Sequence, residues 1–437
     1  MKMSRRTPAS LQHLAMQSLL SNQALAIAAL EDLPVLLFPS LFEEVYARAQ
    51  TEMLKALVQA WPFSCLPLGD LAESPDLETF NTVLDGLDLL LAKKERPNVL
   101  NNRPTESSSL LITEEQPLII HKNLTIKDGS QNALQAYLLQ WAREKQERVQ
   151  LRSRKLQIHS NSIYIIQKAP YLSQMKNLRI LKFSRMSANF NTSRHKNFSY
   201  SCKYAVHLGQ LQHLQELYVH KVFFLYGQLP TILRNLTLLK TLSLSSCPLK
   251  EADLWFLSQC PCSRQLKHLR LRSLPLDNFS PEPLRALLEQ AAGTLETLAL
   301  EDCAITDPQL LGMLPALIQC SQLRVFSFYG NHISMSAVQS LLSHTARLPH
   351  LRRGLYPAPL ESYPPQGCRV GNFDSQRFAQ VQAKLAQALR DMGTTQKVQI
   401  CTNFSHSHKT CQFYTLGPEG NWVVTMEHLP GLSALPL

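Results

Sequence analysis

Four side chains near the end of the chain could coordinate a zinc ion. Cys401, His406, His408 and Cys411 follow the spacing Cys-x4-His-x-His-x2-Cys. Structural zinc sites use thiolate and imidazole ligands, but they usually take them in pairs separated by about two to five residues. Because the spacing here is different, we expect no metal and assign these side chains to the core and the surface.

The other candidates for chemistry are thiols. We interpret Cys260-Pro-Cys262 as a helix end and not as a redox pair. The ten cysteines are scattered, which favours reduced core thiols over disulfides. The sequence has no phosphate-binding loop, no zinc-protease motif and no nucleophile elbow. We therefore expect a protein without catalytic activity and without a cofactor.

The sequence contains a repeat that would position the polar side chains between its leucines. Six segments fit L-x-x-L-x-L, the core of a leucine-rich repeat, and three of them continue into a small polar or thiol residue at Cys247, Cys303 and Asn331. Repeats in phase predict an α/β fold, a leucine-rich repeat solenoid with a curved parallel sheet inside and helices outside. The first residues of the six segments are Leu178, Leu214, Leu239, Leu266, Leu295 and Leu323.

One repeat illustrates the expected local structure. After Leu295, the leucines at alternating positions are predicted to face the core, while Thr297, Ala299 and Glu301 face outwards. The helix that follows is predicted to have Asp307 as its N-cap and a proline as its first residue.

The outward positions of the strands form the expected binding surface. His268, Arg270 and Arg272 align as one positive row. A phosphate or an acidic peptide would fit this row, and an ordinary polar face explains it equally well. The residues expected to bind a client protein on this concave face are Tyr218, His220, Ser243, His268, Arg270, Arg272, Glu301 and Tyr329.

The net charge of +11 raises the question of whether the protein binds nucleic acid. The densest basic stretch, from Arg143 to Lys155, is interleaved with acids and is predicted to be a solvated helix face. No aromatic stacking platform accompanies it, so direct nucleic-acid binding is disfavoured. The sequence shows neither a signal peptide nor a run of about 18 apolar residues, so we expect no membrane contact. The expected location is the cytoplasm, with some presence in the nucleus.

The regions on either side of the repeats differ from them in pattern. Helices are predicted over 11–30, 39–60 and 76–92, a short strand over 118–124, and a helix over 374–391 with a strand over 397–404 near the end. Capping of the exposed ends of a solenoid would by itself explain these pieces. The expected division is an N-terminal helical region over 1–95, an irregular linker with a strand and a basic helix over 96–160, repeats over 161–373 and a C-terminal α/β cap over 374–437.

Several long strings match a known family. Two of them are Leu33-Pro-x-x-Leu-Phe-Pro-x-Leu-Phe42 and Leu355-Tyr-Pro-Ala-Pro-Leu-Glu-Ser-Tyr363, and a third is Phe328-Tyr-Gly-Asn331. On these strings the chain resembles the PRAME family (preferentially expressed antigen in melanoma) over nearly its whole length. The resemblance implies a non-catalytic substrate receptor of a cullin-2 RING ubiquitin ligase. It also implies repression of retinoic-acid-receptor transcription, restraint of differentiation and apoptosis, and promotion of proliferation.

The resemblance further implies partners and docking residues. The partners would be elongin B and elongin C, cullin-2 and an unidentified client protein, with a nuclear receptor as one option. Apolar anchors on one helical face are the expected means of contact. The elongin-docking positions are Ser18, Leu19, Gln23 and Ile27, and the cullin-docking positions are Leu33, Pro34, Leu37 and Leu41.

Other interpretations of the same features remain open. Alanine- and leucine-rich helices often bury their apolar faces within their own domain, and Gln23 stands where the elongin pattern prefers a small residue. Arg96 to Pro104 replaces an early strand that the family usually has, which indicates a lost or eroded first repeat. The alternative function is a transcriptional co-repressor or interaction scaffold that acts without ubiquitin.

Overall fold

The computed structural model divides the chain into two compact units, Met1–Arg154 and Lys155–Leu437. It describes residues 11–68, 77–93, 117–121, 124–127, 133–145, 148–159, 175, 177–186, 194–364, 375–393, 396–402, 412–417 and 420–425.

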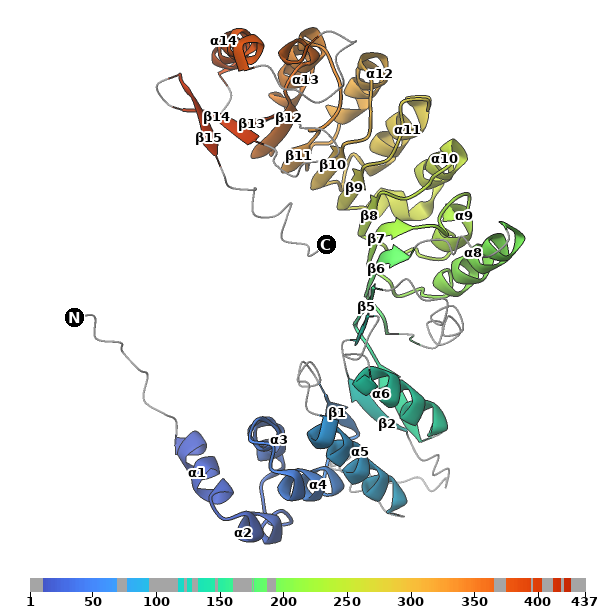
Figure 1. Cartoon of the computed structure of the whole chain (residues 1–437), viewed down its shortest axis with the longest axis vertical. Helices are drawn as coiled ribbons and strands as arrows, with labels where there is room; N and C mark the ends of the chain where they lie inside the picture. Colours follow the sequence, from blue (N-terminus) through green and yellow to red (C-terminus); the bar gives the residue numbers. More distant parts are fainter. Residues whose placement is uncertain are drawn as a thin grey trace, which may run out of the picture. The chain divides into compact units, whose positions relative to one another are not determined.

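The first unit combines helices with a small parallel sheet (Figure 1). Strands β1 (Cys65–Pro67) and β4 (Val149–Arg152) both pair in parallel with β2 (Leu118–His121). Trp61 is 2% exposed, and its ring packs edge-on against three phenylalanine rings, so the unit has an aromatic core of its own. The other elements are α1 (Leu11–Leu20), α2 (Gln23–Ala28), η1 (Val35–Leu37), α3 (Phe38–Ala47), α4 (Thr51–Gln59), α5 (Leu77–Ala92), β3 (Leu124–Lys127) and α6 (Ala133–Glu144).

The second unit is the predicted solenoid, with its helices on one face of the sheet (Figure 1). The strands from β5 to β13 pair in parallel in chain order, and β14 and β15 close the end as an antiparallel hairpin. The expected fold class is confirmed. The strands are β5 (Lys155–His159), β6 (Ile180–Met186), β7 (Glu216–Val222), β8 (Thr241–Ser245), β9 (His268–Arg272), β10 (Thr297–Glu301), β11 (Val325–Ser327), β12 (Arg353–Pro357), β13 (Lys397–Thr402), β14 (Gln412–Leu416) and β15 (Trp422–Thr425). The helices are α8 (Arg194–Leu208), α9 (Leu229–Leu233), α10 (Glu251–Gln259), η6 (Pro261–Gln265), α11 (Glu282–Ala291), α12 (Asp307–Leu317), α13 (Met335–Thr345), η7 (Leu360–Ser362) and α14 (Ser375–Met392).

The leucines of the repeat stack in register inside this unit. Leu298 pairs with Leu269 on one side and with Phe326 on the other, and all three are at most 1% exposed. Burying such a side chain contributes about 1.5–3 kcal/mol. The core is therefore a continuous column that each repeat extends by one layer.

Near the end of each strand from β6 to β11, or shortly after it, one residue is in the left-handed conformation. The backbone N–H of Ser273 donates to the carbonyl of Glu301, and that of Asp302 donates to the carbonyl of Tyr329, so the ladder of hydrogen bonds continues through this turn. The left-handed conformation is unfavourable for residues other than glycine. The turn away from the sheet therefore costs a modest amount of free energy in each repeat whose turn residue is not glycine. The residues are Arg185, Lys221, Ser246, Ser273, Asp302 and Gly330.

Two of the predicted N-terminal helices are interrupted. The helix predicted over 11–30 breaks between α1 and α2, because the Ser21 hydroxyl donates to the Ser18 carbonyl and the Asn22 side chain caps α2 by accepting from the N–H of Leu25. Such side-chain bonds compete with helical ones. The helix predicted over 39–60 breaks between α3 and α4, where Ala49 is left-handed.

Three further predictions change in detail. The basic stretch from Arg143 to Lys155 is not one helix: α6 ends at Glu144, and β4 and β5 follow, because alternating apolar and polar residues from Val149 fit a strand. The N-cap of α12 is Thr306 and not Asp307, and it forms a capping box with Gln309. The sheet also extends beyond the predicted repeats, since β5 pairs with β6 and β13 pairs with β12.

Candidate functional site

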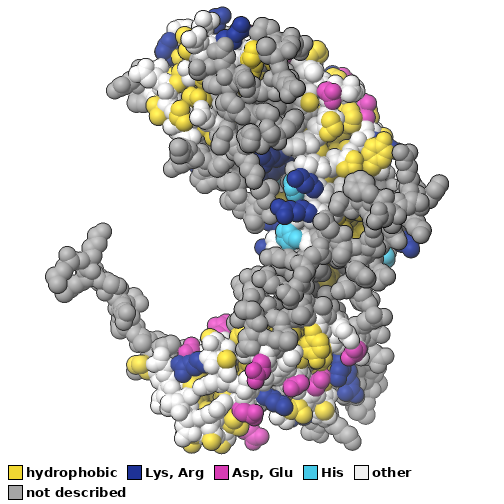
Figure 2. Space-filling view, viewed as in Figure 1, with side chains coloured by type: hydrophobic (Ala, Val, Ile, Leu, Met, Phe, Trp, Pro, Cys, Tyr) yellow, Lys and Arg dark blue, Asp and Glu magenta, His cyan; other side chains and the backbone are white. Residues whose placement is uncertain are grey.

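Strand register brings the predicted client-binding residues together on neighbouring strands. Tyr218, Ser243 and Arg270 are successive partners in one row across β7, β8 and β9. His220 and Arg272 lie in the next row, two residues further along the same strands. Figure 2 shows Lys, Arg and His side chains gathered over these middle strands. The outward face of β6 to β9 is therefore basic.

Not all of the predicted residues are accessible. Arg272 is exposed, and Tyr218, His220, Ser243, His268 and Arg270 are half-buried. Glu301 and Tyr329 are only 8% and 9% exposed, and Ala299 is 1% exposed. Ala299 and Glu301 pair with Arg270 and Arg272 and so lie on the outward face of β10 as predicted, but neither is accessible. Neighbouring strands cover them, and the Ser327 hydroxyl donates to the Glu301 carboxylate at 2.7 Å.

His220 lies at the centre of a cluster of positive charge. Burial lowers the pKa of its imidazole, and the cations of Lys221, Arg272 and Arg185 lower it further. Of these three, Arg185 and Lys221 occupy the left-handed positions of β6 and β7. We call Arg185, Lys221 and Arg272 the cationic edge.

At the start of β9, positive charges are accompanied by carboxylates. The His268 imidazole shares a 3.0 Å hydrogen bond with the Thr297 hydroxyl. Burial lowers its pKa, the Glu296 carboxylate opposes that change, and Arg270 and Lys267 add to it. Burial also lowers the pKa of Arg270, against the opposing effect of Glu301.

Both the hydroxyl and the aromatic ring of Tyr218 already have partners within the protein. Its hydroxyl donates to the Glu216 carboxylate at 2.8 Å, and the Lys182 ammonium lies 4.7 Å from the centre of its ring. Burial, followed by the hydrogen bond to Glu216, raises the pKa of the Tyr218 hydroxyl. Burial lowers the pKa of Lys182, and the nearby Lys155 cation lowers it further. The aromatic face of Tyr218 is thus already occupied by a cation.

We expect the two histidines to make the protein less stable in acid. Both have a folded-state pKa below the ordinary value of 6.5, so the unfolded chain binds the additional protons. The stabilisation of neutral histidine is complete above pH 6.5 and is lost as the pH falls through and below that value. His220→Gln/His268→Gln should therefore show a weaker fall in the free energy of unfolding between about pH 7.5 and about pH 5.5. Urea titrations of both proteins at the two pH values would measure this, and parallel losses would contradict it.

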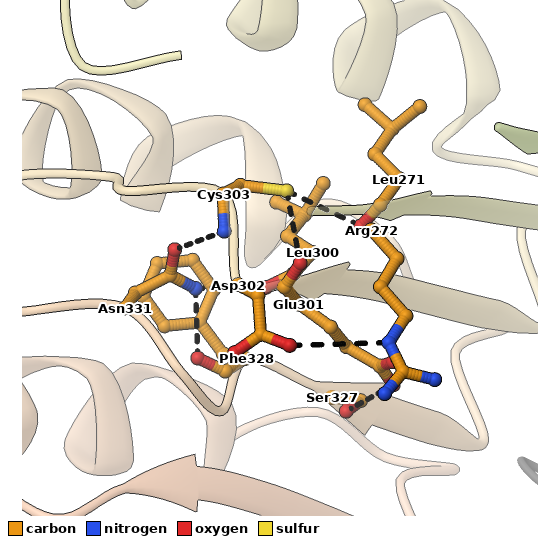
Figure 3. Close-up of polar contacts among 9 residues, drawn as sticks. All are labelled: Leu271, Arg272, Leu300, Glu301, Asp302, Cys303, Ser327, Phe328 and Asn331. Atoms are coloured by element: carbon orange, nitrogen blue, oxygen red, sulfur yellow. Dashed lines mark hydrogen bonds and ion pairs between the residues drawn. The ribbon is translucent and has the colours of Figure 1, made fainter. Parts of the chain in front are cut away.

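A hydrogen-bonded network fixes the acidic end of this surface (Figure 3). Asn331 is 2% exposed, and its amide donates to the carbonyls of Leu300 and Phe328, both at 2.8 Å. Its oxygen accepts from the N–H of Cys303 and of Ile305, both at 3.1 Å. The Cys303 thiol in turn donates to the carbonyl of Leu271 at 3.3 Å. Asn331 and Cys303 thus tie together three successive repeats, as their predicted burial after the strand implied.

Sequence reasoning missed several residues of this surface. Lys182 lies in the row of Tyr218 and Arg270, and its place between Leu181 and Phe183 in the repeat was a usable signal. Arg185 and Lys221 depend on the left-handed turn, which no residue type announces, because neither is a glycine.

Asp253 was missed as well. It is 1% exposed and accepts from the N–H of Gly227, of Leu229 and of Lys250, at 2.9, 3.3 and 2.8 Å. It therefore joins the start of α10 to the start of α9.

The predicted elongin-docking residues do not share one helix. Ser18 and Leu19 lie on α1, whereas Gln23 and Ile27 lie on α2 beyond the break. Ser18 is exposed and the other three are half-buried. The prediction of a single helical face is therefore wrong in geometry, because the Ser21 and Asn22 side chains end one helix and begin the other.

The predicted cullin-docking residues differ in accessibility. Pro34 is exposed, Leu33 and Leu37 are half-buried, and Leu41 is 1% exposed on α3, which packs against α4. Leu41 is thus a core residue. The most exposed leucine of the segment is Leu36, at 85%.

One of the four candidate metal ligands lies among the described residues. Cys401 is buried on β13, whereas His406, His408 and Cys411 lie outside the described residues. Among the residues that are described, no group of three or more side chains could hold a metal ion. Cys260 ends α10 as its C-cap, as predicted, and its thiol is not bridged. A 3.1 Å hydrogen bond from Cys262 lowers the pKa of Cys260 to about 7.

None of the helices that the structure describes is both long enough and apolar enough to cross a bilayer.

Comparison with known proteins gives consistent matches over both units. A family model described as the PRAME N-terminal domain matches residues 8–103, and one described as the PRAME C-terminal domain matches residues 165–420. PRAME family member 12 of Homo sapiens is 40% identical over 447 residues, which cover 89% of this chain and 92% of that protein. PRAME family member 7 of Homo sapiens is 37% identical over 457 residues, which cover 92% and 96%. Among solved structures, an internalin from Listeria monocytogenes covers 72% of this chain and 87% of its own at 12% identity, with a TM-score of 0.35.

Proposed function

The chain belongs to the PRAME family, and on that premise we propose that it is a non-catalytic substrate receptor of a cullin-2 RING ubiquitin ligase. The first unit would bind elongin B, elongin C and cullin-2, and the basic face of the second unit would bind a client protein. Through that client the protein would repress transcription by the retinoic acid receptor, restrain differentiation and apoptosis, and promote proliferation. Its leucine-rich repeat fold supports a role in protein interaction.

The observation that carries this proposal is exposed apolar surface on the first unit. Leu36 is 85% exposed and Leu25 is 60% exposed, whereas the neighbouring Leu20, Leu30 and Leu41 are at most 5% exposed. Leu25 lies within the predicted elongin-docking segment, and Leu36 lies within the predicted cullin-docking segment. An exposed leucine gains about 1.5–3 kcal/mol when a partner buries it fully. These two side chains are therefore better anchors than Leu41.

The proposal predicts that Leu25→Asp/Leu36→Asp loses the ligase subunits. Aspartate is charged and shorter, so it cannot fill an apolar groove on the partner. We expect the recovery of elongin B, elongin C and cullin-2 with the tagged full chain to fall roughly tenfold or more, because two buried anchors are lost. Affinity purification from cells followed by mass spectrometry measures this. Leu238→Asp/Leu311→Asp is the matched control, because these leucines of the second unit are 43% and 50% exposed.

The purification has three outcomes that bear on whether the exposed leucines of the first unit bind the ligase subunits. If Leu25→Asp/Leu36→Asp loses the ligase subunits and Leu238→Asp/Leu311→Asp retains them, the result supports the proposed substrate receptor. Equal recovery with both variants would refute docking through this surface. If the folded wild-type chain recovers no ligase subunit, the ubiquitin-independent co-repressor or scaffold becomes the better hypothesis.

A further inference from the structure

We propose that the cationic edge, formed by Arg185, Lys221 and Arg272, binds an acidic segment of the client protein in an extended conformation. This inference rests on the proposed function only in assigning the segment to a client. The binding chemistry itself is a property of the second unit.

The cationic edge gathers three positive charges, of which Arg272 has acidic neighbours in Glu301 and Asp302. Arg185 and Lys221 lie on neighbouring strands between the paired residues Ser184–His220 and Met186–Val222, and Arg272 lies in the row of His220, so the three cations are close enough to repel one another. In the part of the chain that is described, neither Arg185 nor Lys221 forms an ion pair. Carboxylates placed among them would relieve this repulsion and form charge-assisted hydrogen bonds.

The backbone explains why these side chains meet at one edge. Arg185 and Lys221 are in equivalent left-handed turns of β6 and β7. Arg272 is the last residue of β9, in register with Ser245 and His220. Neighbouring strands are about 4.8 Å apart, so the edge spans about 14 Å from β6 to β9. An extended peptide covers that distance with about four residues.

The next strand limits the length of the segment. Glu301 and Asp302 follow Arg272 across the sheet, and the Arg272 guanidinium lies 3.8 and 3.9 Å from their carboxylates. The Arg272 side chain is still 45% exposed, so it is open to a further anion. Beyond Arg272 the carboxylates of Glu301 and Asp302 would repel additional carboxylates. The ligand is thus a short acidic segment and not a long polyanion.

The same surface is poorly suited to nucleic acid. Binding of single strands uses aromatic rings on which bases stack. The aromatic side chain among the outward residues of β6 to β9 is Tyr218, and the Lys182 ammonium already lies over its ring at 4.7 Å. The hydroxyls of Ser243 and Ser245, between β7 and β9, suit the carbonyls and N–H groups of a peptide.

The test measures binding of a fluorescein-labelled hexaglutamate peptide to the purified full chain by fluorescence anisotropy. At about 50 mM salt, where screening is weak, we expect Lys221→Asn/Arg272→Gln to bind roughly tenfold more weakly than the wild type. Asparagine is chosen at position 221 because it tolerates the left-handed conformation. The matched control is Arg264→Gln/Arg285→Gln, which removes the same charge from η6 and α11 and should bind within about twofold of the wild type. Arg264 is exposed, and the side chain of Arg285 is 43% exposed.

Three outcomes would overturn the proposal. Equal weakening by both double variants would show that only net charge matters. Tighter binding of a labelled hexathymidylate than of hexaglutamate would indicate a nucleic-acid site. Unchanged binding by Lys221→Asn/Arg272→Gln, with thermal unfolding like that of the wild type, would place the peptide elsewhere. The docking variant Leu25→Asp/Leu36→Asp should bind hexaglutamate normally, so failure here and failure of ligase docking are distinguishable.

Discussion

Replacing Asn331 with alanine is expected to lower the free energy of unfolding of the second unit by about 4 kcal/mol. The side chain is 2% exposed and takes part in four hydrogen bonds with the backbone of two neighbouring turns. Alanine would leave two buried N–H groups and two buried carbonyls without these partners, and each such group costs about 1–3 kcal/mol before the structure relaxes. Urea unfolding followed by circular dichroism measures the change.

The control for this prediction is Asn278→Ala. Asn278 is exposed, and among the described residues its amide donates to the neighbouring Asp277 carboxylate, at 3.2 Å. Its replacement should change the free energy of unfolding by no more than about 0.5 kcal/mol. Asn331→Asp should be nearly as harmful as alanine, because a carboxylate keeps the acceptor but loses both donors. A loss below about 1 kcal/mol for Asn331→Ala would show that water replaces the amide.

Replacing Gly354 with leucine is expected to destabilise the second unit by about 3 kcal/mol, although it improves the match to the repeat. In Leu351-x-x-Gly354-x-Tyr356, glycine stands where the other repeats have leucine or phenylalanine. A Cβ at Gly354 would lie 2.7 Å from Cζ of Tyr356. The Tyr356 ring is fully buried, and its hydroxyl is 2.7 Å from the Thr345 hydroxyl, so it cannot move aside easily. The ring fills the space of the missing leucine.

A second substitution separates this account from a general intolerance of leucine. Gly354→Leu/Tyr356→Leu removes the ring and restores the consensus, so it should regain at least half of the lost stability, about 1.5 kcal/mol. Thermal unfolding of the single and double variants makes the comparison. Gly293→Leu is the control, because a Cβ there meets no atom within 4 Å. A double variant no more stable than Gly354→Leu would contradict the packing argument.

The same position explains a limit of the sequence-based prediction. The six repeats from Leu178 to Leu323 were predictable because each carries its own apolar period, which is a local property. The repeat that contains β12 does not match the leucine pattern, because the Tyr356 ring fills the volume that a leucine at Gly354 would occupy. Such compensation between two positions is visible only in the packed core.

The candidate site was predicted to a similar extent. The row from Tyr218 to Arg270 follows from the two-residue period of a strand once the repeats are aligned. The burial of Glu301 and the contribution of Arg185 and Lys221 depend on neighbouring strands and on left-handed turns. The break between α1 and α2 arises from side-chain bonds of Ser21 and Asn22, which compete with the helix without altering its apolar pattern.

The sequence by itself determined the architecture of the second unit, because a period of leucines specifies which face of every strand is buried. It also determined the family, and with it the expectation of a protein-interaction role. Only the tertiary structure decided which polar residues are accessible. Side chains from strands some 30 residues apart become neighbours through register, and their burial and charge depend on those neighbours. The cationic edge around His220 is a product of that arrangement.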